Sequence, residues 1–253
     1  MPQLPAVEQL LEAGLHFGHK RSRRHPKMEP FLFTKKNEIA ISDVRKSLLC
    51  LEKALHYIST LAQDGGTLLF VGTKRQATAR VKQYAELCGQ PYVTNRWIGG
   101  TLTNFLVIAK MIKKYHSEKQ KMEAGEFQKY TKKEHLDRSR EIEELDELIG
   151  GFSQLTKLPT ALFIIDINHD STAVKEARKK NIPIVALCDA NVNPELTLYP
   201  IPGNDDAIKS IELILKLVSE AYTEGAARRT AAKAEEESKK AAASEIVTQS
   251  ASL

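Results

Sequence analysis

Residues 161–188 have the sequence ALFIIDINHDSTAVKEARKKNIPIVALC, which predicts a strand, a helix and a second strand in succession. Residues 161–166 and 184–188 are short, nearly continuous apolar runs, as expected for parallel strands that are covered on both faces. The helix between them covers roughly residues 172–180. This order of elements is typical of a parallel α/β sheet with right-handed crossovers.

The same alternation continues towards the N-terminus. Residues 67–71, TLLFV, predict another buried strand, and Gly72 starts a loop before a helix that ends near Cys88. Asp43 is a plausible N-cap for the helix that follows it. Further elements are predicted as helices at 6–13, 44–61 and 205–222, and as short strands at 37–43 and 92–93. We therefore predict one α/β domain formed by residues 1–103 and 151–223, with a parallel sheet flanked by helices.

Residues 104–150 contain no strand pattern. Apolar residues recur there at alternating spacings of three and four, which favours two antiparallel helices in a coiled-coil hairpin that projects from the sheet. Residues 104–133 carry eight basic and three acidic side chains, whereas residues 134–150 carry two basic and seven acidic ones. The two arms attract each other, and a projecting hairpin with so much charge is also suited to contact a partner.

Composition restricts the class of protein. Of 253 residues, 42% are hydrophobic and 27% are charged, as in ordinary globular proteins. The net charge of +5 is small, so contact with a polyanion has to come from local patches. Cys50, Cys88 and Cys188 lie far apart, which excludes a paired-cysteine zinc ribbon and favours a reducing compartment. No apolar run approaches membrane-span length, and we expect a cytoplasmic protein.

The C-terminal residues 224–253 have almost no large apolar side chain and contain five bases and five acids. We expect a low-complexity tail that is disordered or a frayed helix.

The stretch His16–Lys27, HFGHKRSRRHPK, is the most basic segment of the chain. Pro26 disfavours a helix interior, so the charges are expected on a loop or extended arm, within a basic region of about residues 16–36. Arginine forks hold phosphate with two hydrogen bonds, which favours a polyanionic partner that carries phosphate over a merely solvated loop or a sorting signal. The candidate phosphate-binding residues of this arm are Lys20, Arg21, Arg23, Arg24, His25 and Lys27.

Polar residues follow several predicted strands. The loop Gly72–Arg75 could bind phosphate near a helix N-terminus, but it lacks the glycine spacing of nucleotide-binding loops. Asp205 and Asp206 are better interpreted as part of a helix cap, with Asn204 or Asp205 capping, than as an acid–base pair. His16 and His19 could approach a metal together with an aspartate, but two histidines without a clear third ligand define no site. We therefore expect neither a metal nor another cofactor.

The run Asn95–Asn104, NRWIGGTLTN, contains the only tryptophan of the chain. An exposed Arg96–Trp97 pair could stack on bases, but we favour a Trp97 buried under the root of the hairpin. Asn95 and Arg96 remain candidate contacts for bases or a nucleic-acid backbone.

Five blocks of the chain closely resemble, in order, the bacterial-type ribosomal protein two family of the small subunit. They are LLEAGLHFGHKRSRRHPKMEPFLF, LLFVGTKRQA, NRWIGGTLTNF, LPTALFIIDINHDSTAVKEARKKNIPIVALCD and IPGNDDAIKSI, and the resemblance covers roughly residues 4–222. It implies a Rossmann-like domain with a coiled-coil hairpin and a structural, non-enzymatic role on small-subunit rRNA. It also implies contacts with neighbouring small-subunit proteins, including the large messenger-binding first protein, in bacterial cytosol or an organelle.

The resemblance implies that the candidates of the basic arm face RNA. It adds Lys74 and Arg75, together with Asn95, Arg96 and Asn104, to these RNA-facing candidates. For protein contacts through the hairpin, the candidates are Lys113, Lys114, Tyr115, Lys121, Lys132 and Lys133. Two alternatives are a nucleotide-dependent enzyme that uses the loop Gly72–Arg75, and a protein adaptor that acts through the hairpin. The adaptor role is compatible with a ribosomal role.

Overall fold

The computed structural model describes residues 4–20, 24–36, 39–125 and 132–250, and its largest sheet has five parallel strands. This confirms the predicted α/β class. From β4 the chain first adds β5 on one side and then returns to add β6 on the other side of β4. This reversal creates a topological switch point between β4 and β6. In sheet order the strands are β5 (Tyr92–Val93), β4 (Leu68–Val71), β6 (Ala161–Ile165), β7 (Ile184–Cys188) and β8 (Tyr199–Pro202).

The edge strand β8 is absent from the sequence prediction. Its residues YPIP include Pro200 and Pro202, which cannot donate backbone hydrogen bonds and are tolerated only at sheet edges. Tyr199 lies opposite Val185 of β7, and its ring stacks on Tyr57 with ring centroids 4.6 Å apart. Two prolines normally argue against a strand. They are tolerated in β8 because this strand lies at the edge of the sheet and pairs on one side only.

Alternate side chains of the strands enter two apolar cores, one on each face of the sheet. Phe70 and Phe163 pack together on one face, 5.6 Å between ring centroids, beneath α2 (Val44–Gln63), α3 (Thr78–Leu87) and α7 (Ile208–Ser250). Leu69 and Leu162 face the other core, which α6 (Ser171–Lys179) covers together with the Trp97 loop. The apolar runs are continuous because both faces of each strand are buried.

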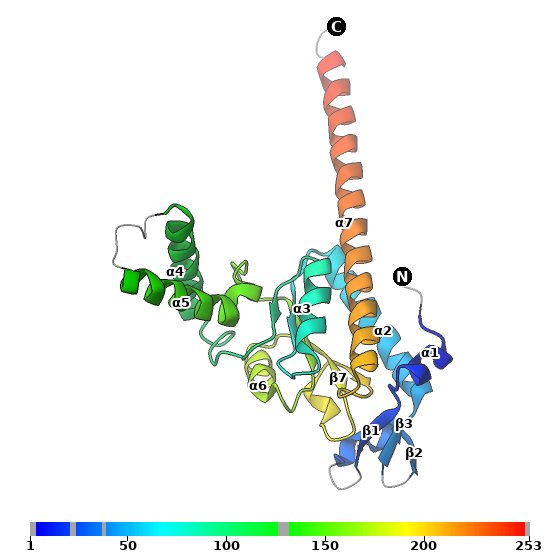
Figure 1. Ribbon diagram of the computed structural model, residues 1–253. Coiled ribbons are helices and arrows are strands. Elements are labelled where there is room, and N and C mark those ends of the chain that lie inside the picture. Colours follow the sequence, from blue (N-terminus) through cyan, green and yellow to red (C-terminus); the bar gives the residue numbers. More distant parts are fainter. Residues whose placement is uncertain (1–3, 21–23, 37–38, 126–131, 251–253) are drawn as a thin grey trace.

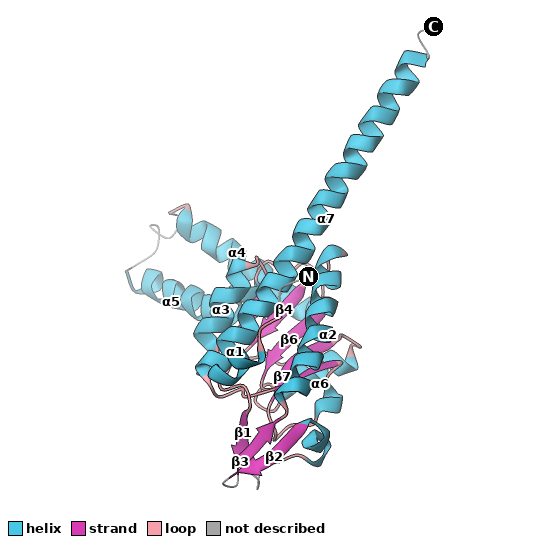
Figure 2. Ribbon diagram, turned by 90° about the vertical axis from the view of Figure 1, so that its right-hand side faces the viewer, coloured by secondary structure: helices cyan, strands magenta, loops and turns pink. Residues whose placement is uncertain are grey.

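A second, antiparallel sheet lies at the carboxyl end of the main sheet, as Figure 2 shows. It contains β1 (Phe17–Lys20), β3 (Ile39–Ser42) and β2 (Leu32–Lys36), and it follows the short helix α1 (Val7–Glu12). Gly18 permits close approach to the main domain, since a Cβ there would lie 3.0 Å from Asp189 Oδ1. The start of the predicted arm is thus an ordered strand, and Pro26–Phe31 form a 3-10 helix.

The start of α2 follows its local signal, whereas the extent of the last helix does not. Asp43 caps α2 by accepting a hydrogen bond from the Arg45 backbone N–H at 3.1 Å, as predicted. The last helix is much longer than the predicted segment 205–222 and extends away from the body in Figure 1. Gly225 lets it approach α2, because a Cβ at this position would lie 2.2 Å from the Ser59 carbonyl oxygen. The character of the tail stays a prediction.

The segment predicted as a hairpin contains α4 (Phe105–Glu123) and α5 (Lys132–Ile149), which lie to one side of the sheet in Figure 1. Lys114 pairs with Glu141 at 2.6 Å and Arg138 with Glu118 at 3.4 Å, an antiparallel order. Buried apolar residues join the pair to the main domain: Ile108, Ile112, Tyr115, Ile142 and Ile149. Coiled-coil geometry itself stays a prediction. None of the described helices is long and apolar enough to span a membrane.

Candidate nucleic-acid interface

The carboxyl ends of the strands place polar loops side by side. Residues 72–75 follow β4, residues 166–170 follow β6, residues 189–193 follow β7, and residues 203–206 follow β8. Asn204 Oδ1 accepts hydrogen bonds from the backbone N–H groups of Asp206 and Ala207 at 2.8 and 3.1 Å. Asn204 therefore caps the turn at residues 205–207, and α7 itself begins after this turn, at Ile208.

Lys74 is the centre of this edge. Its Nζ lies 2.7 Å from Asp205 Oδ1, 2.6 Å from Asp206 Oδ1 and 3.3 Å from Asp166 Oδ2. The lysine side chain is only 12% exposed and that of Asp205 is fully buried. Hydrogen bonds and charge attraction from these acids outweigh burial and raise the pKa of Lys74 above its usual range.

The raised pKa of Asp205 shows that the ammonium group of Lys74 does not compensate all the negative charge at this edge of the sheet. Burial, together with the charge of Asp166, raises the pKa of Asp205 to about 7 although Lys74 opposes the shift. A phosphate placed against these carboxylates would be repelled. The expected RNA contact of Lys74 is therefore corrected to a structural one, and Arg75 is the exposed cation of the loop.

The Trp97 loop is held by a residue that sequence reasoning missed. Glu176 Oε1 accepts from the Gly100 N–H at 2.7 Å and from Trp97 Nε1 at 3.3 Å. Its Oε2 accepts from the backbone N–H groups of Leu102 and Thr103 at 2.9 and 3.1 Å. Burial raises the pKa of Glu176, but these donors lower it further, so the net pKa is below its usual range. In sequence, Glu176 looks like any polar position of α6.

The interpretation of Trp97 as a buried residue is confirmed, because its side chain is 8% exposed. The flanking candidates behave differently. Asn95 and Arg96 are exposed just before the tryptophan, and Asn104 is exposed at the start of α4. Glu176 therefore fixes a loop whose outer side presents one cation and two amides.

The basic arm is only partly described. Arg21 and Arg23 lie outside the described residues, and of Lys20 only the backbone, at the end of β1, is described. Arg24 lies 3.3 Å from Glu29, and Lys27 pairs with Glu195. The His25 N–H donates to the Ala190 carbonyl at 2.8 Å, and its Nδ1 accepts from the Lys27 N–H at 3.2 Å. These contacts attach the far end of the arm to the β7 loop.

The hairpin candidates differ in accessibility. Tyr115 is 2% exposed and its hydroxyl donates to Asp146, so it stabilises the helix pair and is corrected from a surface contact to an internal one. Lys114 pairs with Glu141, and Lys121 pairs with Glu118 at 2.7 Å. Lys113 and Lys133 are exposed, and of Lys132 only the backbone position is described.

Comparison with known proteins finds a family that matches most of the chain. The family model described as Ribosomal protein S2 matches residues 10–225. A protein of Acidiphilium cryptum called small ribosomal subunit protein uS2 is 47% identical over 92% of this chain and 90% of its own length. A protein of the same name from Corynebacterium diphtheriae is 44% identical over 87% of this chain and 83% of its own length. Another, from Rhodococcus jostii, is 42% identical over 92% of this chain and 78% of its own length.

The structural role of Lys74 predicts a large difference between neighbouring lysine and arginine variants. Lys74→Met leaves the buried carboxylates without their cation and should lower the free energy of unfolding by about 3–5 kcal/mol. Arg75→Met, at an exposed position, should change it by less than about 0.5 kcal/mol. Urea denaturation followed by circular dichroism measures both. Equal stability of the two variants would contradict the structural role.

The anchoring role of Glu176 predicts a pH-dependent stability contribution. Because its pKa is lower in the folded chain, this contribution is complete above the unfolded pKa of about 4.3 and is lost as the pH falls through the folded value. At pH 7, Glu176→Gln should cost about 1–3 kcal/mol and shift the emission of Trp97 to longer wavelength. The difference from wild type should shrink in acid. Lys175→Gln, exposed on the same helix, is the matched control and should leave Trp97 emission unchanged.

Proposed function

Because this chain belongs to the Ribosomal protein S2 family, a structural component of the small ribosomal subunit and not an enzyme, we propose that it binds small-subunit rRNA directly. The proposed contact surface consists of the basic arm, Arg75 and the outer side of the Asn95–Asn104 loop. The observation that carries the proposal is the separation of charges at the carboxyl edge. Carboxylates occupy its interior around Lys74, whereas exposed cations lie on the loops around it.

The contacts are proposed to be mainly with phosphate. Arg75 and Arg96 are exposed and form no ion pair with another described residue, so their guanidinium groups are available for bidentate hydrogen bonds. Both follow edge or near-edge strands and stand on loops that the core fixes. Such an arrangement recognises the shape and backbone of folded RNA and reads few bases.

Binding of a free nucleotide at residues 72–75 is disfavoured by the same geometry. Thr73 donates its hydroxyl to Asp170 Oδ1 at 2.8 Å, and its backbone N–H points to Asp170 Oδ2 at 3.3 Å. Burial raises the pKa of Asp170. The donors that a nucleotide phosphate would need therefore serve carboxylates within the chain.

Two double variants test the proposed rRNA surface. Arg75→Gln with Arg96→Gln, and Arg23→Ala with Arg24→Ala, should each weaken binding to small-subunit rRNA. Each should also reduce the slope of log affinity against log salt by about one for every phosphate that the variant no longer neutralises. Filter binding across a salt series measures the slope, and sucrose gradients of tagged protein measure assembly into the subunit.

The matched control for these variants is Lys53→Gln with Lys216→Gln, which removes two exposed cations from α2 and α7. It should leave the slope and the assembly unchanged. The rRNA proposal fails if binding weakens by the same factor in the control and in the test variants.

Neighbouring small-subunit proteins, including the large messenger-binding first protein, are proposed to meet α4 and α5. The support is the exposed side of this helix pair, where Leu106 is 78% and Val107 50% exposed beside a basic surface that includes Lys113. Exposed apolar side chains beside charged ones are typical of a protein contact.

Charge reversal tests the protein contact separately. Lys113→Glu with Lys133→Glu should reduce crosslinking to neighbouring proteins in purified subunits and leave the salt slope for naked rRNA almost unchanged. Lys53→Glu is the control for added negative charge. If the double variant forms crosslinks in the same yield as wild type, this side of the helices does not contact a neighbouring protein.

A further inference from the structure

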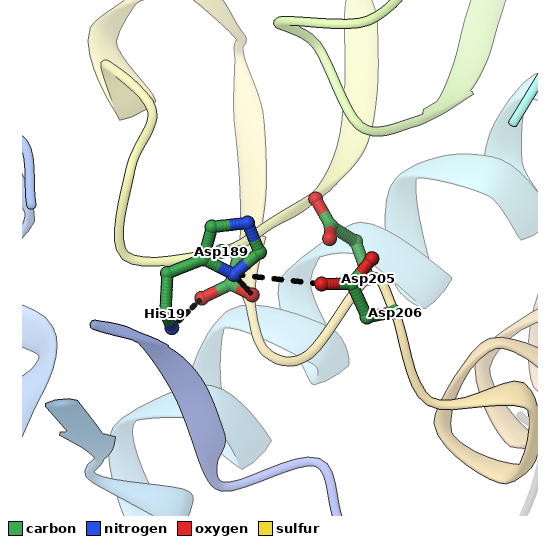
Figure 3. Close-up of side chains that lie close together, drawn as sticks. All are labelled: His19, Asp189, Asp205 and Asp206. Atoms are coloured by element: carbon green, nitrogen blue, oxygen red, sulfur yellow. Dashed lines mark hydrogen bonds and ion pairs between the residues drawn. The ribbon is translucent and has the colours of Figure 1, made fainter. Parts of the chain in front are cut away.

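The interior of the carboxyl edge suits a cation and not a phosphate. In Figure 3, Asp189, Asp205 and Asp206 gather beside His19, and one nitrogen or oxygen atom of each residue lies within 4.8 Å of the others. A phosphate placed among these carboxylates is repelled. Contacts with a polyanion beyond those on the outer loops therefore need cations that lie away from these acids, and such cations are present on α6.

The exposed side of α6 carries only positive charge. Lys175, Arg178 and Lys179 are exposed, and so is Lys180, which directly follows the helix. The single acid of the helix, Glu176, is buried. Because residues three and four positions apart lie on one face of a helix, the first three side chains share one surface. We call these four cations the α6 basic surface.

The α6 basic surface has no acidic partner among the described residues. Other helices pair their exposed cations with acids: Arg80 of α3 lies 3.4 Å from Glu212 of α7, and Lys114 of α4 lies 2.6 Å from Glu141 of α5. Four like charges on so short a segment repel one another. The surface therefore gains from an anion that a partner supplies.

The helix dipole accounts for only part of this pattern. Arg178 and Lys179 lie in the last turn of α6, where a cation interacts favourably with the carbonyl groups that end the helix. This effect falls off within one turn, and Lys175 lies one turn earlier. The dipole therefore gives no reason for the cation at position 175.

The partner class that fits this surface is RNA and not protein. Protein contacts usually have an apolar centre, but none of the exposed large apolar side chains of the described chain belongs to α6. Ser171 and Thr172 are exposed at the start of the helix, and hydroxyl groups are common donors to nucleic-acid phosphates. The exposed side of α6 thus offers only cations and polar groups.

The helix is held rigidly on the sheet. Ala173, Val174 and Ala177 are buried in the core that also contains residues of α4 and α5, and Figure 1 shows these three helices on the same side of the sheet. The nine residues of α6 span about 13 Å, and a crossover helix runs opposite to the parallel strands that it connects. Its cations therefore extend from the carboxyl ends of the strands towards their amino ends.

We propose that the α6 basic surface binds the phosphate backbone of small-subunit rRNA, as an extension of the rRNA surface proposed above, on which this inference rests. Glu176 links α6 to the loop that contains Arg96, through hydrogen bonds from Trp97 Nε1 at 3.3 Å and the Gly100 N–H at 2.7 Å. The RNA contact continues from that loop along α6. The opposite face of the sheet, which α2, α3 and α7 cover, has no part in it.

The first test measures filter binding of the full-length chain to small-subunit rRNA across a salt series. The triple variant Lys175→Gln, Arg178→Gln and Lys179→Gln should bind more weakly. It should also lower the slope of log affinity against log salt by about 2–3, since each lost phosphate contact lowers it by about 0.7–0.9. The charge-preserving variant Lys175→Arg with Lys179→Arg should keep the wild-type slope.

The matched control removes the same charges from the opposite face of the sheet. It combines Arg45→Gln, Lys53→Gln and Lys216→Gln, all at exposed positions of α2 and α7, and it should leave the slope unchanged. The inference is overturned if the α6 triple variant keeps the wild-type slope, or if the control lowers the slope as much as the α6 variant does.

A second measurement uses the unaltered chain and is independent of how well any variant folds. Acetylation followed by mass spectrometry should be slower at Lys175, Lys179 and Lys180 in the complex with protein-free rRNA than in the free chain. Lys53, on the opposite face, should react at the same rate in both states. Equal reactivity of the α6 lysines in both states overturns the inference.

The two rRNA surfaces can fail separately. If Arg75→Gln with Arg96→Gln lowers the slope and the α6 triple variant does not, the surface at the carboxyl edge stands and its extension along α6 is wrong. If neither variant lowers the slope, both proposals are wrong. If each lowers it and the two effects add, both surfaces contact rRNA at separate phosphates.

Discussion

The structure depends on one constraint at the carboxyl edge of the sheet, where a single ammonium group faces three carboxylates from two strand ends. Lys74 follows β4, Asp166 follows β6, and Asp205 and Asp206 follow β8, so their ion pairs join strands from the centre to the edge of the sheet. Buried charges are tolerated only when they are paired, and removal of the one cation would expose the whole cost of burying the acids. The cation and the acids of this edge are therefore engaged with one another.

This cluster explains how an α/β fold with a switch point can serve as a structural protein. In open α/β sheets the crevice at such a point is the usual ligand site. Here its donors are used internally: Lys74 binds acids, and Thr73 binds Asp170. The positions left for recognition are the outer sides of the loops, where Arg75 and Arg96 are exposed. Recognition by the outer surface suits a large, folded polyanion better than a small molecule that needs an enclosed pocket.

The sequence predicted the parts of the fold that hydrophobic burial determines, and missed those that single long-range contacts determine. Strands β4, β6 and β7 are continuous apolar runs and were identifiable, whereas β8 contains two prolines and was not. Lys74 and Arg75 look equivalent as adjacent cations, yet one is enclosed by acids that follow strands distant in the chain and the other is exposed. Glu176 has no local signal either, because its importance comes from the Trp97 loop about 75 residues earlier.

The small sheet shows how these contacts affect the proposed interface. A long, flexible basic arm would lose conformational entropy when it settles on RNA, at about 1–2 kcal/mol for each backbone residue that becomes fixed. In this chain the arm starts from β1, whose His19 is bound to Asp189, and it ends where His25 donates to Ala190. Both attachments are to the same loop after β7, so His19 and His25 are held by the main domain before any partner arrives. The acidic loops at the strand ends thus anchor the basic arm. Their carboxylates cannot bind RNA, but they position the basic residues that we propose to bind it.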